Sequence, residues 1–343
     1  MRLLLLIFLM ALVPALAQRD HDQHCQTVAS VPLPPESLGP KPTVFPACES
    51  YMAYAGIGRP VDYAAARMCA WKERAAQLAE LPQNAEAPTA WAIGGDLILV
   101  NLYANGFGVP RSLPLALHLA CEDRSGIAGD AVDNLYQLFK ETVPPTKPFD
   151  VCDSAFSTFS MNFCSDYQSE IADERRNRAI RAFSTQWTPA QKSAFAKVKD
   201  AEEKYVSAHS QELDQGGTIH ILRGLGSAGI MHQNFYLDLR QFERGQIPKG
   251  TSADAITVES RMNLQYRANL AAARAPLPSL EGDTAVTVEG IEKVQETWRQ
   301  YRDAWLAFAT VRYPSVPSSA FRVYFAEERR RLLLAMRSQI YRD

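Results

Sequence analysis

The stretch GIEKVQETWRQYRDAWLAF, Gly290 to Phe308, decides the fold of this chain. Its large apolar residues recur three or four positions apart, which places them on one face of a helix: Ile291, Val294, Trp298, Tyr301, Trp305 and Phe308. Such aromatic residues are typical anchors of exposed binding surfaces. Their strict helical spacing among aliphatic residues favours instead a stripe that packs into a core. No residue of the stretch stands in a catalytic pattern, so it points away from an enzyme.

A weaker copy of this pattern precedes it in the chain. Three residue pairs lie 96 positions apart: Phe195 and Ile291, Val198 and Val294, and Tyr205 and Tyr301. The earlier copy has Glu202 and His209 where the later one has tryptophans. The duplication predicts two antiparallel helical-bundle domains, a degenerate one at 149–215 and a second one at 216–343 that includes a C-terminal helix.

Two segments nearer the N-terminus also resemble each other. YAGIGRPVDYAAARMCAW (Tyr54–Trp71) and ANGFGVPRSLPLALHLAC (Ala104–Cys121) each place Gly-x-Gly before a helix with small alanines. Glycine suits a tight turn between helices because it adopts positive φ without a steric penalty. The pattern resembles the Sel-like repeat, a tetratricopeptide-related helical hairpin, over residues 47–142. The resemblance implies hairpins that bury a core by stacking on their neighbours and that bind proteins rather than catalyse reactions.

The chain begins with a pattern typical of a secretory signal peptide. Arg2 precedes an apolar run from Leu3 to Leu12, and small residues stand at Ala15 and Ala17. We expect residues 1–17 to be removed and the mature protein to be periplasmic or secreted. No later segment has the ~20 apolar residues that a spanning helix needs, so we expect no membrane span.

The composition gives no sign of a nucleic-acid partner or an anionic membrane surface. The chain has 36 basic and 38 acidic residues, a net charge of −2. It has six cysteines: Cys25, Cys48, Cys69, Cys121, Cys152 and Cys164. An even number in an oxidising compartment predicts disulfides, for which 15 connectivities exist. Disulfide candidates include Cys48, Cys69, Cys152 and Cys164.

Residues 18–46 are polar and then rich in proline, a composition that predicts an extended linker. The cluster from Asp20 to Cys25 contains two histidines and offers groups that bind metals. A solvated tail with Cys25 held by a disulfide is the better interpretation.

The later copy carries a motif that identifies a family. MNLQYRANL followed by VQETWRQYRDAW is similar to the LprI family of lysozyme inhibitors, which are secreted bacterial proteins with a short helical domain. The resemblance spans about Asp150 to Tyr313. The matching residues are Met262, Asn263, Tyr266, Gln295, Trp298, Tyr301, Arg302 and Asp303.

The resemblance carries structural and functional expectations. The family's later cysteine is missing, since Leu306 stands near its place, and this implies a disulfide between Cys152 and Cys164. It also implies a periplasmic protein that binds lysozyme, although no inhibitory residue transfers from the motif. We expect Arg302 and Asp303 to fix the helix pair by a salt bridge, and Asn263 to be a hydrogen-bonded buried amide on the facing helix.

Other polar residues give weaker signals. His220 and His232 lack the spacing of metal ligands and a nearby carboxylate, and RGLGSAG between them lacks the ending of a phosphate loop. Glu202 and Glu203 lie in a charged helix and are expected to be solvated. The C-terminal helix Phe321–Tyr341 is amphipathic with a basic patch from Arg329 to Arg331, and we expect it to pack on the body of the protein.

We therefore expect an all-α exported protein, with Sel/tetratricopeptide-like hairpin repeats followed by two helical bundles and with no catalytic, metal or cofactor site. The leading hypothesis is a non-enzymatic protein that binds lysozyme and protects peptidoglycan. A periplasmic scaffold that holds another envelope protein through its repeats is the alternative. A cell-wall hydrolase is a third possibility and needs a catalytic carboxylate or cysteine in a cleft. The sequence leaves the oligomeric state open.

Overall fold

The computed structural model describes residues 21–39, 47–79, 95–123, 126–141, 146–213, 220–274 and 286–341. Over these residues the chain is all-α and has no strand, as the apolar spacing predicts. It divides into two compact units, Met1–Cys164 and Ser165–Asp343. None of the described helices has both the length and the apolar character needed to cross a membrane. The predicted signal peptide lies outside the described residues.

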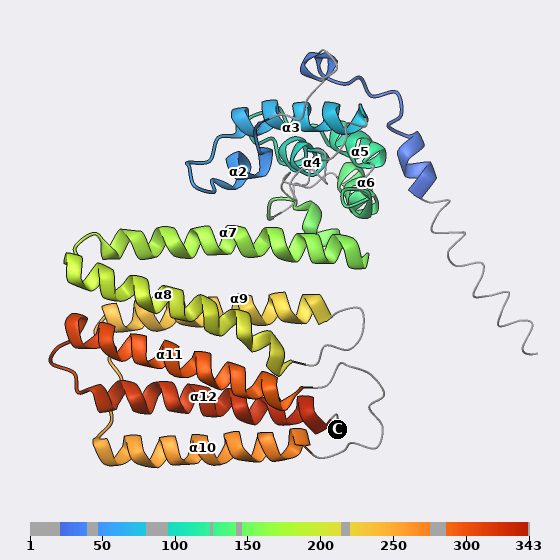
Figure 1. Ribbon diagram of the computed structural model, residues 1–343. Helices are drawn as coiled ribbons and strands as arrows, with labels where there is room; N and C mark the ends of the chain where they lie inside the picture. Colours follow the sequence, from blue (N-terminus) through green and yellow to red (C-terminus); the bar gives the residue numbers. More distant parts are fainter. Residues whose placement is uncertain are drawn as a thin grey trace, which may run out of the picture. The chain divides into compact units, whose positions relative to one another are not determined.

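The first unit is built from short helices, each of which packs on the next along the chain (Figure 1). Its elements are η1 (Pro35–Leu38), α2 (Ser50–Ala55), α3 (Tyr63–Leu78), α4 (Asp96–Asn105), α5 (Leu113–Glu122), η3 (Gly129–Ala131), α6 (Val132–Lys140) and η4 (Val151–Ser154). The central helix α4 is buried along almost its whole length, because both α3 and α5 pack on it.

The two Gly-x-Gly turns have the same geometry. Their glycines all have positive φ: Gly56, Gly58, Gly106 and Gly108. Matching backbone hydrogen bonds close the turns, from Ile57 N–H to Met52 O (2.9 Å) and from Phe107 N–H to Leu102 O (3.0 Å). The following helices begin alike, with side-chain caps from Asp62 on α3 and Ser112 on α5. The segments that resemble each other in sequence thus form matching helical hairpins.

Three disulfides lie in the first unit: Cys25–Cys121, Cys48–Cys69 and Cys152–Cys164. The first one ties the N-terminal segment to α5, and Val28 beside it is only 1% exposed. His118 Nδ1 donates a hydrogen bond to the carbonyl of Val28 (2.9 Å). The prediction of an extended linker over 18–46 is therefore wrong for residues 21–39, which the disulfide and the buried Val28 anchor to the hairpins.

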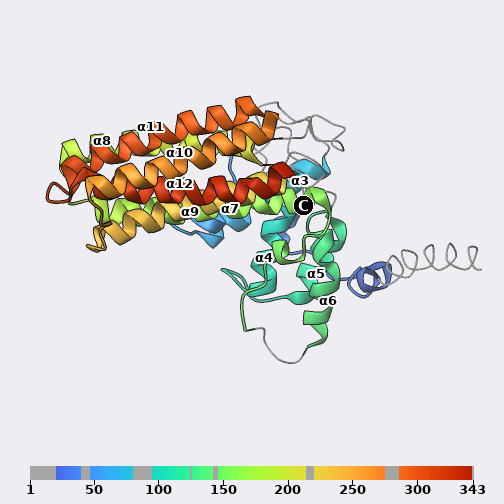
Figure 2. The same cartoon turned by 90° about the horizontal axis from the view of Figure 1, so that it is seen from below.

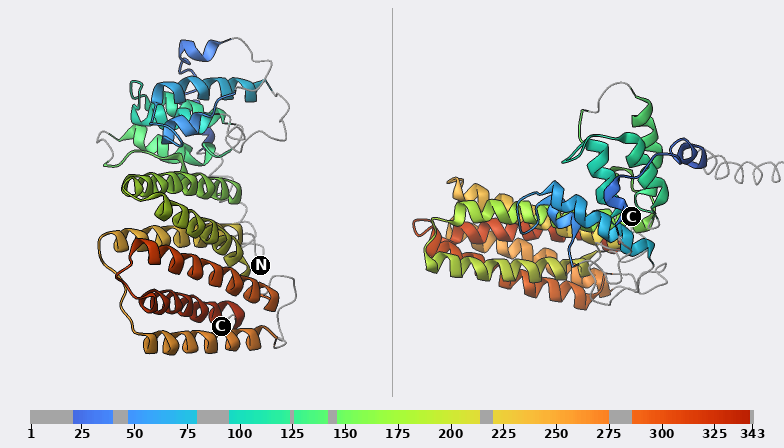
Figure 3. Two further views of the ribbon diagram at one scale, coloured as in Figure 1. Left: turned by 60° about the vertical axis from the view of Figure 1, so that its left-hand side comes forward. Right: turned by 90° about the horizontal axis from the view of Figure 1, so that it is seen from above.

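The second unit consists of long helices, shown from three further directions in Figure 2 and Figure 3. They are α7 (Thr158–Ser184), α8 (Pro189–His209), α9 (His220–Glu243), α10 (Ser252–Arg274), α11 (Val288–Arg312) and α12 (Ser318–Tyr341), with a 3₁₀ turn, η5 (Ser210–Glu212), after α8. The first residues of α7, up to Cys164, belong to the first unit. Helix α11 packs against α8 on one side and α12 on the other, and α12 packs extensively on α10. Helix α8 begins at a capping box of Thr188 and Gln191.

The two predicted bundle domains are one bundle. The stripe helices α8 and α11 pack against each other, and a single core joins residues of both copies, among them Phe195, Val198, Tyr205, Ile291, Val294 and Trp305. The later stripe is buried, with Trp305 and Phe308 at 0% exposure. The prediction of two separate domains fails because each stripe covers a single helix face, and the two faces bury each other.

Candidate functional site

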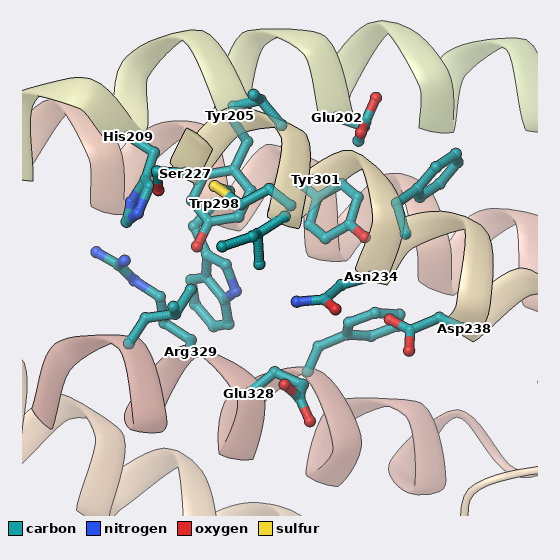
Figure 4. Close-up of a pocket in the computed structure, with 16 residues that line it drawn as sticks. Glu202, Tyr205, His209, Ser227, Asn234, Asp238, Trp298, Tyr301, Glu328 and Arg329 are labelled. Carbon is teal, nitrogen blue, oxygen red and sulfur yellow. The ribbon is translucent and has the colours of Figure 1, made fainter. Parts of the chain in front are cut away.

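A cavity of about 120 Å³ lies in the second unit, among α8, α9, α11 and α12 (Figure 4). Aromatic rings form much of its wall: Tyr205, Phe235, Trp298, Tyr301 and Phe325. The polar groups that line it include Glu202, His209, Asn234, Asp238, Glu328 and Arg329. One water needs roughly 10–15 Å³ of such space, so the cavity has room for several waters or a small organic group.

Helix α9 contributes Ser227, Ile230 and Asp238, among other side chains, to the cavity lining. A Cβ atom placed on Gly224, Gly226 or Gly229 would meet no atom within 4 Å, and Ser227 beside them lines the cavity. Ile230, also on the lining, is 62% exposed. The glycine-rich segment is thus part of a helix and not a phosphate-binding loop.

Asp238 on α9 supplies a carboxylate at one end of the cavity, near Asn234 and Glu328 (Figure 4). The hydroxyl of Tyr324 donates a hydrogen bond to Asp238 Oδ1. Among the described residues, no basic side chain forms an ion pair with Asp238. Burial raises the pKa of Asp238 to about 7, although the Tyr324 hydrogen bond acts in the opposite direction. Near neutral pH this carboxyl group is therefore divided between its charged and neutral forms.

Arg329 on α12 lies at the opposite end of the cavity from Asp238 (Figure 4). Its side chain is 0% exposed, and its guanidinium donates to Glu212 Oε2 (2.7 Å) and to Gln295 Oε1 (2.9 Å). Burial alone raises the pKa of Glu212, but the charge and hydrogen bonds of Arg329 outweigh it and hold this pKa below its ordinary value. His209 also contacts Glu212, at 3.3 Å. The charge of Arg329 is thus compensated inside the protein.

Glu202 and His232 form a second compensated pair, between α8 and α9. His232 Nδ1 lies 2.6 Å from Glu202 Oε1, and the Glu202 side chain is only 3% exposed. The hydrogen bond to Glu202 raises the pKa of His232, against the opposing effect of burial. Two expectations are therefore wrong: Glu202 is not solvated, and His232 does have a carboxylate partner. Glu202 occupies the position on its stripe that Trp298 occupies on the later one, so it lies on the buried face of its helix.

The same pair belongs to the one group of described residues with metal-ligand geometry. Ligand atoms of Glu202, Glu203 and His232 lie within 4.8 Å of one another. Arg176 and Lys199 line the neighbouring pocket. The positive charges of Arg176 and Lys199 repel a divalent cation, and Glu202 is already hydrogen-bonded to His232. The group is therefore better explained as a contact between helices.

Some motif residues of α11 line the cavity, one supports Arg329 beside it, and two lie at the surface. Trp298 and Tyr301 are buried in the core as the stripe predicts, and both also line the cavity. Gln295 is fully buried and accepts the hydrogen bond from Arg329. Arg302 and Asp303 pair with each other (2.7 Å), and the guanidinium of Arg302 lies 5.2 Å from the Trp298 ring. The expectation that this pair joins two helices is wrong, because adjacent residues of one helix satisfy each other at the surface.

The motif residues of α10 lie away from the cavity. Tyr266 is partly buried against the core, whereas Asn263 is exposed. The buried amide of this helix is Asn269, whose Nδ2 donates to the carbonyl of Leu333 on α12 (2.7 Å). The expectation for Asn263 is wrong because α10 packs mainly on α12, which turns a different face of α10 inward.

Sequence reasoning missed the charged residues of the site. The sequence groups Arg329 with Arg330 and Arg331 in a basic patch, yet Arg329 lies four positions from both Phe325 and Leu333, on the buried stripe of its helix. On α8, Glu202 and His209 lie three and four positions from Tyr205, on the same helix face. A charged residue in register with an apolar stripe was the available signal. Asp238 carried no comparable signal.

All six cysteines are in disulfides, so no thiol nucleophile exists. Comparison of the chain with protein-family models, with curated proteins and with solved structures finds no match. The cavity itself offers a carboxylate, aromatic faces and buried ion pairs. This chemistry suits the recognition of a positively charged group.

Proposed function

We propose that the protein is an exported, non-enzymatic binding protein that binds lysozyme and so protects peptidoglycan. The resemblance of the Met262–Asp303 region to the LprI family supports the choice of partner. The observation that carries the proposal is the partly buried carboxylate of Asp238, which has no ion-pair partner among the described residues, in an aromatic cavity. Such a site suits a basic side chain of a cationic partner. The three disulfides support export, because disulfides persist in oxidising compartments.

A lysis assay tests this proposal. Purified mature protein is titrated into reactions in which a vertebrate, an invertebrate or a phage lysozyme digests cell walls. We expect dose-dependent inhibition of at least one type at micromolar concentration. The absence of inhibition of every type contradicts the choice of partner.

The scaffold alternative is supported by the matching helical hairpins of the first unit, since stacked hairpins present extended surfaces to proteins. Full-length protein that leaves all three lysozymes active, and that is recovered from the periplasm in a stable complex with one envelope protein, favours the scaffold.

One observation favours the hydrolase alternative. Asp238 is a partly buried carboxyl at a cavity, and its pKa of about 7 is typical of a general acid. Against it, about 120 Å³ is little space for a polysaccharide chain. Release of wall fragments by the protein alone, abolished by Asp238→Asn, supports the hydrolase and overturns the non-enzymatic proposal.

A further inference from the structure

We propose that the cavity among α8, α9, α11 and α12 binds a guanidinium group, the side chain of an arginine on a protein partner, with Asp238 as its counter-ion. This inference rests on the proposed function in one respect, that the partner is a cationic protein. It deepens that proposal by naming the group that is recognised and the residue that recognises it.

The charge balance of the cavity identifies Asp238 as the binding carboxylate. Three other acids that line or support the cavity already have basic partners: Glu202 has His232, Glu212 has Arg329, and Glu328 has Arg331 at 2.8 Å. Within the described residues, Asp238 has the Tyr324 hydroxyl as its hydrogen-bond donor and no basic partner. The charge of Arg331 lowers the pKa of Asp238 but forms no ion pair with it. A partly buried carboxylate that lacks an ion-pair partner is stabilised when a cation enters the cavity.

The aromatic wall favours guanidinium over ammonium. Tyr301, Trp298 and Phe325 line the cavity together with Asp238. A guanidinium is planar, stacks on aromatic faces, is weakly hydrated and donates two parallel hydrogen bonds to a carboxylate. Two rings of the cavity wall already have a guanidinium of this chain beside them. Arg302 lies 5.2 Å from the Trp298 ring, and Arg329 lies 5.9 Å from the Tyr205 ring.

A second observation concerns the hydroxyl of Tyr205, which lines the same cavity. The residue is only 4% exposed, and its hydroxyl makes no hydrogen bond of full geometry within the described structure. The Arg329 guanidinium acts on this hydroxyl from nearby. A ligand or water in the cavity that completes a hydrogen bond to it is therefore favourable.

Binding should release protons near neutral pH. The pKa of Asp238 is about 7 because burial disfavours its charged form. A guanidinium beside the carboxylate favours the charged form and lowers this pKa. At pH 7 the fraction of Asp238 that is protonated before binding then loses its proton on binding.

The test is isothermal titration calorimetry of the mature protein with N-acetyl-arginine amide at pH 7, in two buffers of different ionisation enthalpy. We expect saturable binding at millimolar concentrations and net proton release. N-acetyl-citrulline amide has nearly the same shape without the charge, and it should bind at least about tenfold more weakly. N-acetyl-lysine amide should fall between them.

Two variants assign the effect. Asp238→Asn keeps the shape of the side chain, and we expect at least about tenfold weaker arginine binding and no proton release. Asp200→Asn removes an exposed acid of α8 that pairs with Lys204 outside the cavity, and it should bind as the wild type does. Thermal melts followed by circular dichroism establish that both variants are folded.

Three outcomes overturn the inference: no binding of the arginine probe at tens of millimolar, equal binding of citrulline, or unchanged binding and proton release in Asp238→Asn. The probe experiment contains no lysozyme. Its failure therefore counts against the guanidinium site alone, and failure of the lysis assay alone counts against lysozyme as the partner.

Discussion

Tyr205 of α8 stacks on Tyr301 of α11, with ring centroids 5.5 Å apart and ring planes at 25°. The two residues occupy the same position in the two copies of the apolar stripe. The two copies of the stripe thus contact each other through the tyrosine that both copies share. Both rings also line the cavity, so the contact that joins the stripes shapes the candidate site as well.

Trp305 should be among the residues on which the stability of the second unit depends most. It is 0% exposed, and its rings contact Phe235, Phe242 and Phe325. Trp305→Ala should lower the free energy of unfolding by about 3–5 kcal/mol because it leaves a large cavity. Trp305→Phe should cost less than half as much, because phenylalanine keeps an aromatic ring in the core and leaves a smaller cavity. Chemical denaturation measures both, and the exposed Thr310→Ala should stay within about 0.5 kcal/mol of wild type.

The buried Arg329–Glu212 pair predicts a large effect of removing one partner. Arg329→Met should destabilise the protein by about 3–5 kcal/mol, because Glu212 is left as an uncompensated buried charge. The double variant Arg329→Met, Glu212→Gln should recover at least half of this loss. Arg330→Met, next to it in sequence, removes a partly exposed pair with Glu327 and should cost less than about 1 kcal/mol. Equal costs at the two arginines would show that the buried pair is not special.

The same pair predicts sensitivity to acid. The pKa of Glu212 is lower in the folded protein than its ordinary 4.5, since Arg329 outweighs burial. The stabilisation is therefore complete above the unfolded pKa and is lost as the pH falls through the folded value. The difference in unfolding free energy between wild type and the double variant should shrink below about pH 4.5. A difference that is constant from pH 6 to pH 3, at about the same ionic strength, contradicts this assignment.

Much of this bundle follows from the sequence, because each stripe is periodic and each helix has clear ends. The pairing of the stripes does not, since an apolar face specifies that it is buried and leaves open what buries it. α10 illustrates the limit: Asn263 and Asn269 lie on different faces of one helix, and only the packing of α12 decides that Asn269 is the buried one. The charged site is predictable in part, because Arg329 and Glu202 stand in register with apolar stripes. Asp238 becomes visible only when α9 is placed beside α11 and α12.

The Glu202–His232 pair predicts a pH dependence of stability opposite in sign to that of the Arg329–Glu212 pair. The hydrogen bond to Glu202 raises the pKa of His232 above 6.5, with Asp173 and Glu203 acting in the same direction. The stabilisation is complete below the unfolded pKa of 6.5 and is lost as the pH rises through the folded value. The difference in unfolding free energy between wild type and His232→Gln should be larger at about pH 6 than at about pH 9. A difference that grows toward high pH would reverse the sign and remove this interpretation.

The disulfide framework makes a prediction that needs no variant. Proteolysis of the non-reduced mature protein should give three linked peptide pairs, which contain Cys25–Cys121, Cys48–Cys69 and Cys152–Cys164. Mass spectrometry before and after reduction identifies them. A free thiol or a different pairing contradicts the anchoring of residues 21–39 to α5.

The lysis assay with wild type and Asp238→Asn in parallel tests the central claim most directly, because it joins the partner to the cavity. The account predicts micromolar inhibition of at least one lysozyme type by the wild type and inhibition at least about tenfold weaker by Asp238→Asn, with Asp200→Asn unchanged. Equal inhibition by wild type and Asp238→Asn would contradict the role of the cavity, and no inhibition of any lysozyme type would contradict the proposed function itself.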